Sequence, residues 1–272
     1  MVCRAKTKIH PPSVYDRQSR DKLTFVNRRI ALLPIAAFLL ISCGGGGGSA
    51  VRPQNSFRAN NIGDSWNYDV SINFGQFGAY KGTIVEALTA DTYSGQSTIR
   101  DTRTFYLTLK TGPATITSYS EISLKGVLLA TMVNAKLYDV ISDTFTVGRT
   151  IDGSTRTAGV ITLSNGTTLT ETYRVVGTEK VATKAGTFDC WVVAQTVISS
   201  DGTIDRFTMW VAPEIGGYVK ISDRTVNPDG TGYTYVASLT SIVTPPPPKG
   251  VNPTPLARPS SFALPSFRTL RH

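Results

Sequence analysis

Histidine is almost missing from this sequence of 272 residues, and cysteine is rare. The two histidines, His10 and His272, lie near the two ends of the chain. This excludes a Ser-His-Asp site, a histidine-ligated zinc and an imidazole base from everything between them. The three cysteines, Cys3, Cys43 and Cys190, lie far apart, and none belongs to a C-x-x-C pair typical of metal or redox sites. We therefore predict a protein that is not an enzyme and that uses no metal or cofactor.

Charged residues are also scarce, at 17% of the chain, and the net charge of +9 is unevenly distributed. Residues 1–42 carry eight basic and two acidic side chains, and residues 245–272 carry four basic and no acidic ones. The remaining part, residues 43–244, holds 16 basic and 17 acidic side chains and is nearly neutral. A nucleic-acid-binding domain would need a basic surface, so this distribution predicts no nucleic-acid partner.

An export signal lies near the amino terminus. Arg28 and Arg29 precede an apolar run over residues 30–41, which is short for a membrane span but typical of a signal peptide. The run ends in Leu-Ile-Ser-Cys, which resembles the bacterial lipobox. That resemblance implies cleavage between Ser42 and Cys43, with diacylglycerol on the Cys43 sulfur and acylation of the new amino terminus. Several acyl chains would anchor the protein stably in a membrane. The alternative is an uncleaved signal anchor with an ordinary cysteine.

The residues around this signal refine the prediction. Gly44 follows Cys43, at the position where an aspartate would suggest retention in the inner membrane of enteric bacteria, so this family rule favours the outer membrane. The polar segment before the apolar run is long for a signal peptide, so we also consider Val26 as the true start. Four regions follow from these patterns and from changes in composition. They are a signal peptide (1–42), a lipidated and glycine-rich tether (43–58), a β domain (59–244) and a proline-rich basic tail without regular structure (245–272).

The central region has the pattern of an all-β domain. Within Ser65–Phe74, apolar and polar residues alternate strictly, which predicts a strand with one buried face and one solvated face. Three pairs mark hairpin turns between later apolar runs, namely Asn165-Gly166, Asp201-Gly202 and Asp229-Gly230. The segment Ile122–Leu137 fits a helix about as well as strands. Ten or eleven antiparallel strands predict one strongly curved sheet, a half-barrel or incomplete barrel, with a β-sandwich as the alternative.

Two segments carry a resemblance to other proteins. They are VATKAGTFDC at residues 181–190 and WVAPEIGGYVK at residues 210–220, and GDSWNY at residues 63–68 adds to them. Together they resemble uncharacterised bacterial envelope lipoproteins with an AGTF…WxAPxxG-type β domain, similar to the half-barrels of the periplasmic lipoprotein carriers. The resemblance implies a structural or apolar-ligand role without catalytic residues. Gly217 is extra relative to the compact motif and suggests a longer turn there.

The remaining predictions concern the interior of the sheet. Large aromatic side chains are candidates for either ligand-facing or core positions, namely Trp66, Tyr68, Phe188, Trp191 and Trp210. Cys190 is expected to be a small buried hydrophobe. The carboxylates lie scattered along the strands and form no recognisable acid/base pair. We predict a non-catalytic, lipid-anchored cell-envelope protein facing the periplasm, with an apolar or lipid ligand on a concave sheet. The alternative is a filled core without ligand, with an envelope protein as partner.

Overall fold

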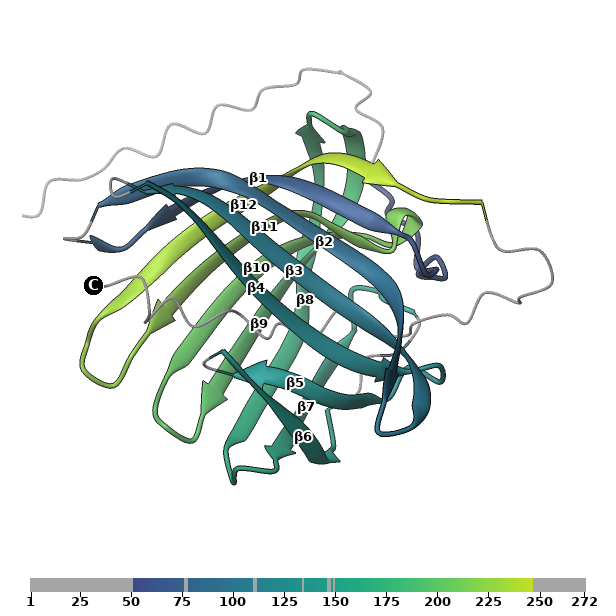
Figure 1. Cartoon of the computed structure of the whole chain (residues 1–272). Coiled ribbons are helices and arrows are strands. Elements are labelled where there is room, and N and C mark those ends of the chain that lie inside the picture. Colours follow the sequence, from purple (N-terminus) through teal and green to yellow (C-terminus); the bar gives the residue numbers. More distant parts are fainter. Residues whose placement is uncertain are drawn as a thin grey trace, which may run out of the picture. The chain divides into compact units, whose positions relative to one another are not determined.

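The fold was analysed in a computed structural model that describes residues 51–246, except residues 76–77, 110–111, 134, 146–147 and 149. The described part is all-β, and its twelve strands run antiparallel to their neighbours in a single sheet (Figure 1). The predicted signal peptide (1–42), residues 43–50 of the predicted tether with Cys43, and residues 247–272 of the predicted tail lie outside the described residues. The strands are β1 (Ser65–Asn73), β2 (Ala79–Tyr93), β3 (Gln96–Leu109), β4 (Gly112–Ser123), β5 (Leu128–Val133), β6 (Lys136–Asp143), β7 (Arg156–Leu163), β8 (Thr168–Thr183), β9 (Gly186–Ser199), β10 (Ile204–Ala212), β11 (Gly217–Val226) and β12 (Gly232–Val243). A short 3-10 helix, η2 (Pro213–Ile215), precedes β11.

The sheet closes into a barrel because its first and last strands pair. Strand β1 lies between β2 and β12, and Tyr68 faces Ile84 on one side and Leu239 on the other. All other strands pair with their neighbours in sequence, as a meander does. The prediction of a single, strongly curved antiparallel sheet is confirmed. The curvature goes as far as closure, which leaves no free sheet edge among the described strands.

Three hairpin turns at one end of the barrel share the sequence Asx-Gly-Thr. In the turn between β7 and β8, the Gly166 N–H donates to the Leu163 carbonyl at 2.9 Å, and Gly166 has a φ of 82°. The Asn165 Oδ1 accepts the N–H of Thr167 at 3.0 Å. The turns at Asp201-Gly202 and Asp229-Gly230 repeat this arrangement. All three predicted hairpins are therefore confirmed, and each is a three-residue loop with its glycine in the left-handed region.

The segment Ile122–Leu137 forms no helix. It contains the end of β4, all of β5 and the start of β6, joined by a turn in which Gly126 has a φ of 82°. A glycine in the left-handed conformation ends one strand and reverses the chain, and the sequence pattern did not separate this from helical spacing. Among the described residues, no helix is both long enough and apolar enough to span a membrane.

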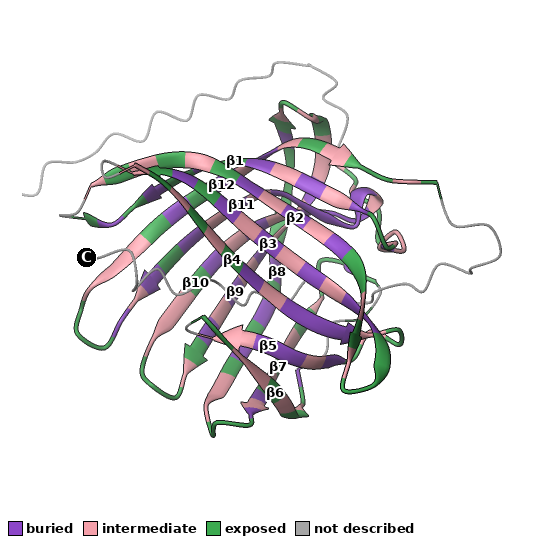
Figure 2. Cartoon of the chain, in the orientation of Figure 1, coloured by how far each residue is buried: buried purple, intermediate pink, exposed green. Residues whose placement is uncertain are grey.

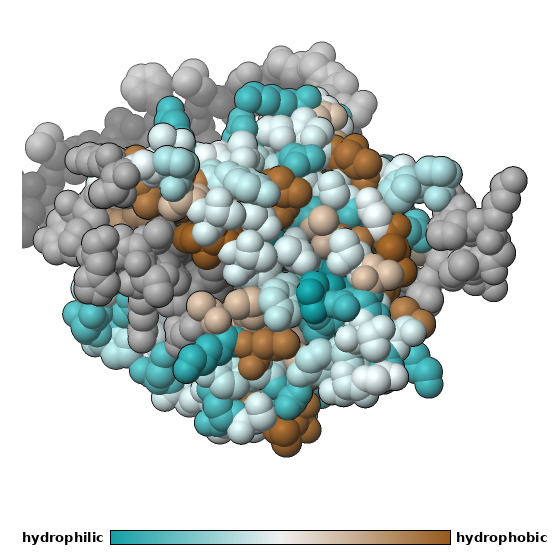
Figure 3. Space-filling model, in the orientation of Figure 1, coloured by the Kyte–Doolittle hydropathy of each residue, from teal (hydrophilic) through white to brown (hydrophobic). Residues whose placement is uncertain are grey.

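Burial follows the strand alternation (Figure 2). On β1, Trp66, Tyr68, Val70 and Ile72 are buried, while the residues between them are exposed or partly exposed. Trp66, Tyr68, Tyr218 and Phe105 are among the largest fully buried side chains. On the face shown in Figure 3, apolar side chains form small separate patches among hydrophilic ones. The inward-facing side chains of the strands therefore form the core of the barrel.

Candidate functional site

One end of the barrel is crossed by the segment of residues 51–64, which we call the strap. The Gln54 carbonyl accepts the indole N–H of Trp191 at 2.9 Å. The Asn55 carbonyl accepts the N–H of Ile151 at 2.7 Å. The strap is thus tied to β9 and to the loop that precedes β7, which lie far from it in sequence.

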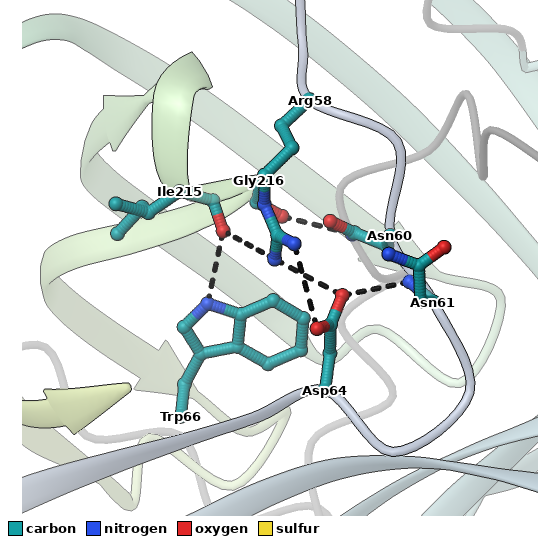
Figure 4. A network of polar contacts seen from close by, with 7 residues as sticks. All are labelled: Arg58, Asn60, Asn61, Asp64, Trp66, Ile215 and Gly216. Atoms are coloured by element: carbon teal, nitrogen blue, oxygen red, sulfur yellow. Dashed lines mark hydrogen bonds and ion pairs between the residues drawn. The ribbon is translucent and has the colours of Figure 1, made fainter. Parts of the chain in front are cut away.

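A network of polar contacts ties the strap to η2 (Figure 4). The Arg58 guanidinium forms an ion pair with the buried Asp64 carboxylate at 3.0 Å and donates to the Ile215 carbonyl at 3.2 Å. The same carboxylate accepts the N–H of Asn61 at 2.7 Å. Charge-assisted hydrogen bonds of this kind are stronger than neutral ones, so Asp64 fixes the strap just before β1 begins.

The two sequence motifs meet in this network. The Trp66 indole donates to the Ile215 carbonyl at 3.1 Å, and the Asn60 amide donates to the Gly216 carbonyl at 2.9 Å. Gly217 does not lengthen the turn, because it is the first residue of β11. A Cβ on Gly217 would lie 3.0 Å from the Trp66 Nε1, so the glycine allows the close approach of the indole ring. The conformation of the WVAPEIGGYVK motif therefore follows from its packing against GDSWNY.

We expect Gly216→Ala to destabilise the protein more than Gly95→Ala does. Both glycines have a left-handed φ, 65° and 78°, so both variants bear the backbone strain of about 1 to 2 kcal/mol. An added Cβ on Gly216 would lie 1.8 Å from the Asn60 Oδ1, whereas one on Gly95 meets nothing within 4 Å. Gly216→Ala should therefore lose about 1 to 3 kcal/mol more. Urea unfolding of the two variants measures this, and equal losses would contradict it.

The structure separates the five aromatic candidates. Trp66 and Tyr68 are almost completely buried in the core. Phe188, Trp191 and Trp210 are partly buried and pack against it.

Trp210 lies on the face of β10 opposite to its buried neighbours Met209 and Val211, so it points away from the barrel interior. Its indole N–H donates to the Glu179 carboxylate at 2.6 Å, and the Lys220 ammonium lies 4.4 Å from its ring centroid. These contacts link β10 on the outer surface to β8, across β9, and to the neighbouring β11.

Cys190 is a free, fully buried thiol, as expected. Burial raises the pKa of its thiol to about 12, and the negative charge of Glu214 adds to the shift. Because the thiolate is the reactive form of cysteine, burial and the raised pKa both predict low reactivity of Cys190 in the folded protein.

Buried polar side chains share the interior of the barrel with apolar ones, and we call one set of them, defined below, the polar belt. On β2 and β3, the buried positions alternate as Ile84, Glu86 and Leu88 and as Asp101, Arg103 and Phe105. Charged residues therefore share the inward faces with apolar ones. The polar belt consists of Tyr68, Glu86, Asp101, Arg103, Ser118, Ser120, Thr131, Tyr173, Tyr218 and Tyr235, which are all buried.

A buried ion pair lies at the centre of the polar belt. The Arg103 Nε and the Glu86 Oε2 are 3.2 Å apart, and the Arg103 Nη2 and the Glu86 Oε1 are 3.3 Å apart. Burial alone would lower the pKa of Arg103, but the negative charges of Glu86 and Asp101 raise it above its usual value. The guanidinium therefore stays charged inside the barrel.

A second group of interior carboxyls lies nearer the Asx-Gly turns. The Thr225 hydroxyl lies 2.6 Å from the Asp205 Oδ1 and 3.1 Å from the Asp223 Oδ2. One hydroxyl hydrogen serves only one of these acceptors, so the second contact is satisfied when a carboxyl carries a proton. Burial raises the pKa of Asp205 to about 6; burial and then the charge of Asp205 raise the pKa of Asp223 to about 8.

The sequence analysis missed these carboxyls, although strand alternation carries a signal for them. Asp223 lies two positions from the buried Ile221 and Thr225 on its strand. Glu171 likewise lies two positions from the buried Tyr173, so alternation along the strand predicts that both carboxyls point inward. Asp205 and Asp223 contact the same threonine hydroxyl, an arrangement that the sequence analysis did not foresee. Among the described residues, no group of three or more His, Cys, Asp or Glu could hold a metal ion.

Comparisons with known proteins give a limited likeness. No curated protein matches the chain. A presumed exported protein with a YmcC-like fold from Bacteroides fragilis is 14% identical, with a TM-score of 0.34, over 70% of this chain and 100% of its own. A presumed lipoprotein from Parabacteroides distasonis is 12% identical, with a TM-score of 0.36, over 71% and 100%. The hypothetical lipoprotein YmcC from Escherichia coli is 18% identical, with a TM-score of 0.33, over 68% and 85%. A protein-family model described as DUF3108-like matches residues 143–227, which contain the strands β7 to β11 and the WVAPEIGGYVK motif.

Proposed function

We propose that the chain is a non-catalytic lipoprotein of the bacterial cell envelope, anchored by acyl chains on Cys43, with a barrel that its own side chains fill. The Leu-Ile-Ser-Cys sequence after an apolar run of signal-peptide length supports the anchor. Gly44 favours the outer membrane, with the domain facing the periplasm. In this arrangement the barrel meets an envelope protein through its outer surface.

The polar belt is the observation that favours a filled interior over a lipid ligand. An acyl chain inside the barrel would have to lie against the Arg103–Glu86 pair and the tyrosine hydroxyls. Apolar groups give such polar atoms no hydrogen bonds, and burying polar atoms without partners costs about 1 to 3 kcal/mol each. The large buried side chains Trp66 and Phe105 also occupy the space that an acyl chain would need.

Fractionation of cells that express the full chain tests the anchor. We expect the wild-type chain in the membrane fraction, with a mass that includes the acyl chains, because several chains together anchor stably. The Cys43→Ala variant should appear in the soluble fraction or keep its uncleaved signal, without acyl mass. Native mass spectrometry of the full chain in detergent tests the interior. A bound lipid that leaves only after organic extraction would contradict the filled barrel. A wild-type chain found in the membrane fraction without acyl mass would contradict the anchor.

A further inference from the structure

The proposed membrane anchor directly precedes the strap, and we call the end of the barrel that the strap crosses the strap end. Only residues 43–50 separate Val51 from Cys43, on whose proposed acylation this inference rests. A chain spans at most about 3.5 Å per residue, so this segment reaches no further than about 28 Å in any conformation. The strap itself is fixed to β9, because the Gln54 carbonyl accepts the Trp191 indole N–H. The strap end is therefore held close to the bilayer surface.

The order of the strands places further connections at the strap end. Strand β1 begins at Ser65, directly after the strap, and every strand runs antiparallel to its neighbours. The connections β2–β3, β4–β5, β6–β7 and β8–β9 therefore lie at the same end as the strap, and so does η2 between β10 and β11 (Figure 1). The three Asx-Gly-Thr turns lie at the opposite end. The two ends of the barrel can thus be compared for the side chains that they expose.

The turn between β4 and β5 exposes apolar side chains at the strap end. Leu124 is 43% exposed and Val127 is 54% exposed, with the exposed Lys125 between them. The Gly126 N–H donates to the Ser123 carbonyl at 2.8 Å, and the Val127 N–H donates to the Ser123 Oγ at 3.0 Å, so the turn has a fixed conformation. Turns usually carry small and polar residues, as the three Asx-Gly-Thr turns do. Apolar side chains beside a basic one fit a bilayer interface, where burial of apolar area and attraction to anionic lipids add together.

The strap adds a third exposed apolar side chain close to this turn. Ile62 is 41% exposed, and the N–H of the next residue, Gly63, donates to the Leu88 carbonyl on β2 at 2.7 Å. Leu88 pairs with Asp101 on β3, and Asp101 pairs with Ser120 on β4. The end of the strap is therefore two strand spacings, about 10 Å, from the strand that leads into the turn.

We propose that the strap end docks on the bilayer that holds the acyl chains of Cys43, with Leu124 and Val127 in the headgroup region. The anchor keeps the lipid surface at a high effective concentration, so a contact of modest strength is sufficient. Full burial of one apolar side chain of this size favours the docked state by about tenfold or more. Lys125 adds attraction to anionic headgroups. In this orientation the opposite end of the barrel, with its polar turns, points away from the bilayer into the periplasm.

Fluorescence quenching in vesicles tests the docking. The full acylated chain is reconstituted in phosphatidylethanolamine and phosphatidylglycerol with a doxyl-labelled phospholipid, and bimane is attached at Leu124→Cys. Ile198→Cys is the matched control, because Ile198 is apolar, 44% exposed and three residues before the Asp201-Gly202 turn at the opposite end. We expect the doxyl lipid to quench bimane at position 124 severalfold more than at position 198. The wild-type chain treated with bimane corrects for labelling of Cys190.

The outcomes separate the docking from the anchor. A chain without acyl mass would overturn the anchor and this inference with it. An acylated chain with equal quenching at positions 124 and 198 would overturn the docking alone, and a protein would then be the favoured partner of the turn.

A second reporter tests the part played by the turn itself. Bimane at Ile62→Cys should lose most of its quenching when Leu124→Asn and Val127→Asn are added, because polar side chains gain nothing from entering the interface. Ile198→Asn should leave the quenching at position 62 unchanged. Equal quenching at position 62 in all of these variants would overturn the assignment of the contact to the β4–β5 turn.

Discussion

Arg103→Met should lower the free energy of unfolding by about 3 to 5 kcal/mol, because it removes one partner of a buried ion pair and leaves the other charge behind. Glu86 and Asp101 would then lie in the barrel interior without the guanidinium that faces them. The alkyl part of methionine keeps most of the packing, so the loss reports charge rather than a cavity. Chemical denaturation at pH 7 gives the difference directly.

A second ion pair provides the control. Lys184 and Asp69 form an ion pair on the outer surface, with 2.6 Å between the Lys184 Nζ and the Asp69 Oδ2. Their side chains are 73% and 50% exposed. Exposed pairs contribute about 0 to 1 kcal/mol, so Lys184→Met should change little. The double variant Glu86→Gln with Arg103→Met should recover part of the loss, since it removes one of the stranded charges. A loss for Arg103→Met no larger than for Lys184→Met would contradict the importance of the buried pair.

The free energy of unfolding should fall as the pH rises from about 4 to about 8, by a few kcal/mol. The pKa of Asp223 is raised to about 8 in the folded protein, whereas an unfolded aspartate titrates near its usual value of about 4. The folded protein therefore binds more protons than the unfolded chain between these two values, and its stability is lost as the pH rises through this range. Asp205, with a pKa of about 6, acts in the same direction over the lower part of the range.

Urea unfolding of Asp223→Asn at several pH values checks this dependence. Asparagine keeps the size of the neutral carboxyl but does not titrate, so the variant should show a flatter pH profile. Asp69→Asn is the control, because Asp69 is exposed on the outer face of β1. A profile for Asp223→Asn as steep as that of the wild type would mean that other groups govern the pH dependence.

The elements that the sequence predicts well depend on neighbours in the chain. Asn165-Gly166 forms its turn through its own side chain and the left-handed conformation of its glycine, both of which are local. The alternation in Ser65–Phe74 likewise predicts which face of β1 is buried. Fold class and hairpin positions could therefore be derived before the strand partners were known.

The polar belt and the strap could not be derived in the same way. The partner of Glu86 is Arg103, and the pairing depends on the register of a long hairpin that turns at Ser94-Gly95. Asn60 meets Gly216, which is 156 positions away, through contacts that exist only once the barrel has formed. Pairing between distant residues leaves no periodicity in the sequence. The spacing of acidic residues two positions from apolar ones predicts only that they point inward, and it does not predict their partners.

Pairing of β1 with β12 has a consequence for when this protein folds. Ser65 lies opposite Val243, so the ring remains open until nearly the whole domain is available. Contacts between such distant residues make folding slow, and the unpaired edge of β1 is a template for aggregation in the meantime. During export the chain crosses the membrane from its amino-terminal side, so the first strand arrives long before its partner. We therefore expect a nascent or partly translocated chain to need protection of this edge until the last strand arrives.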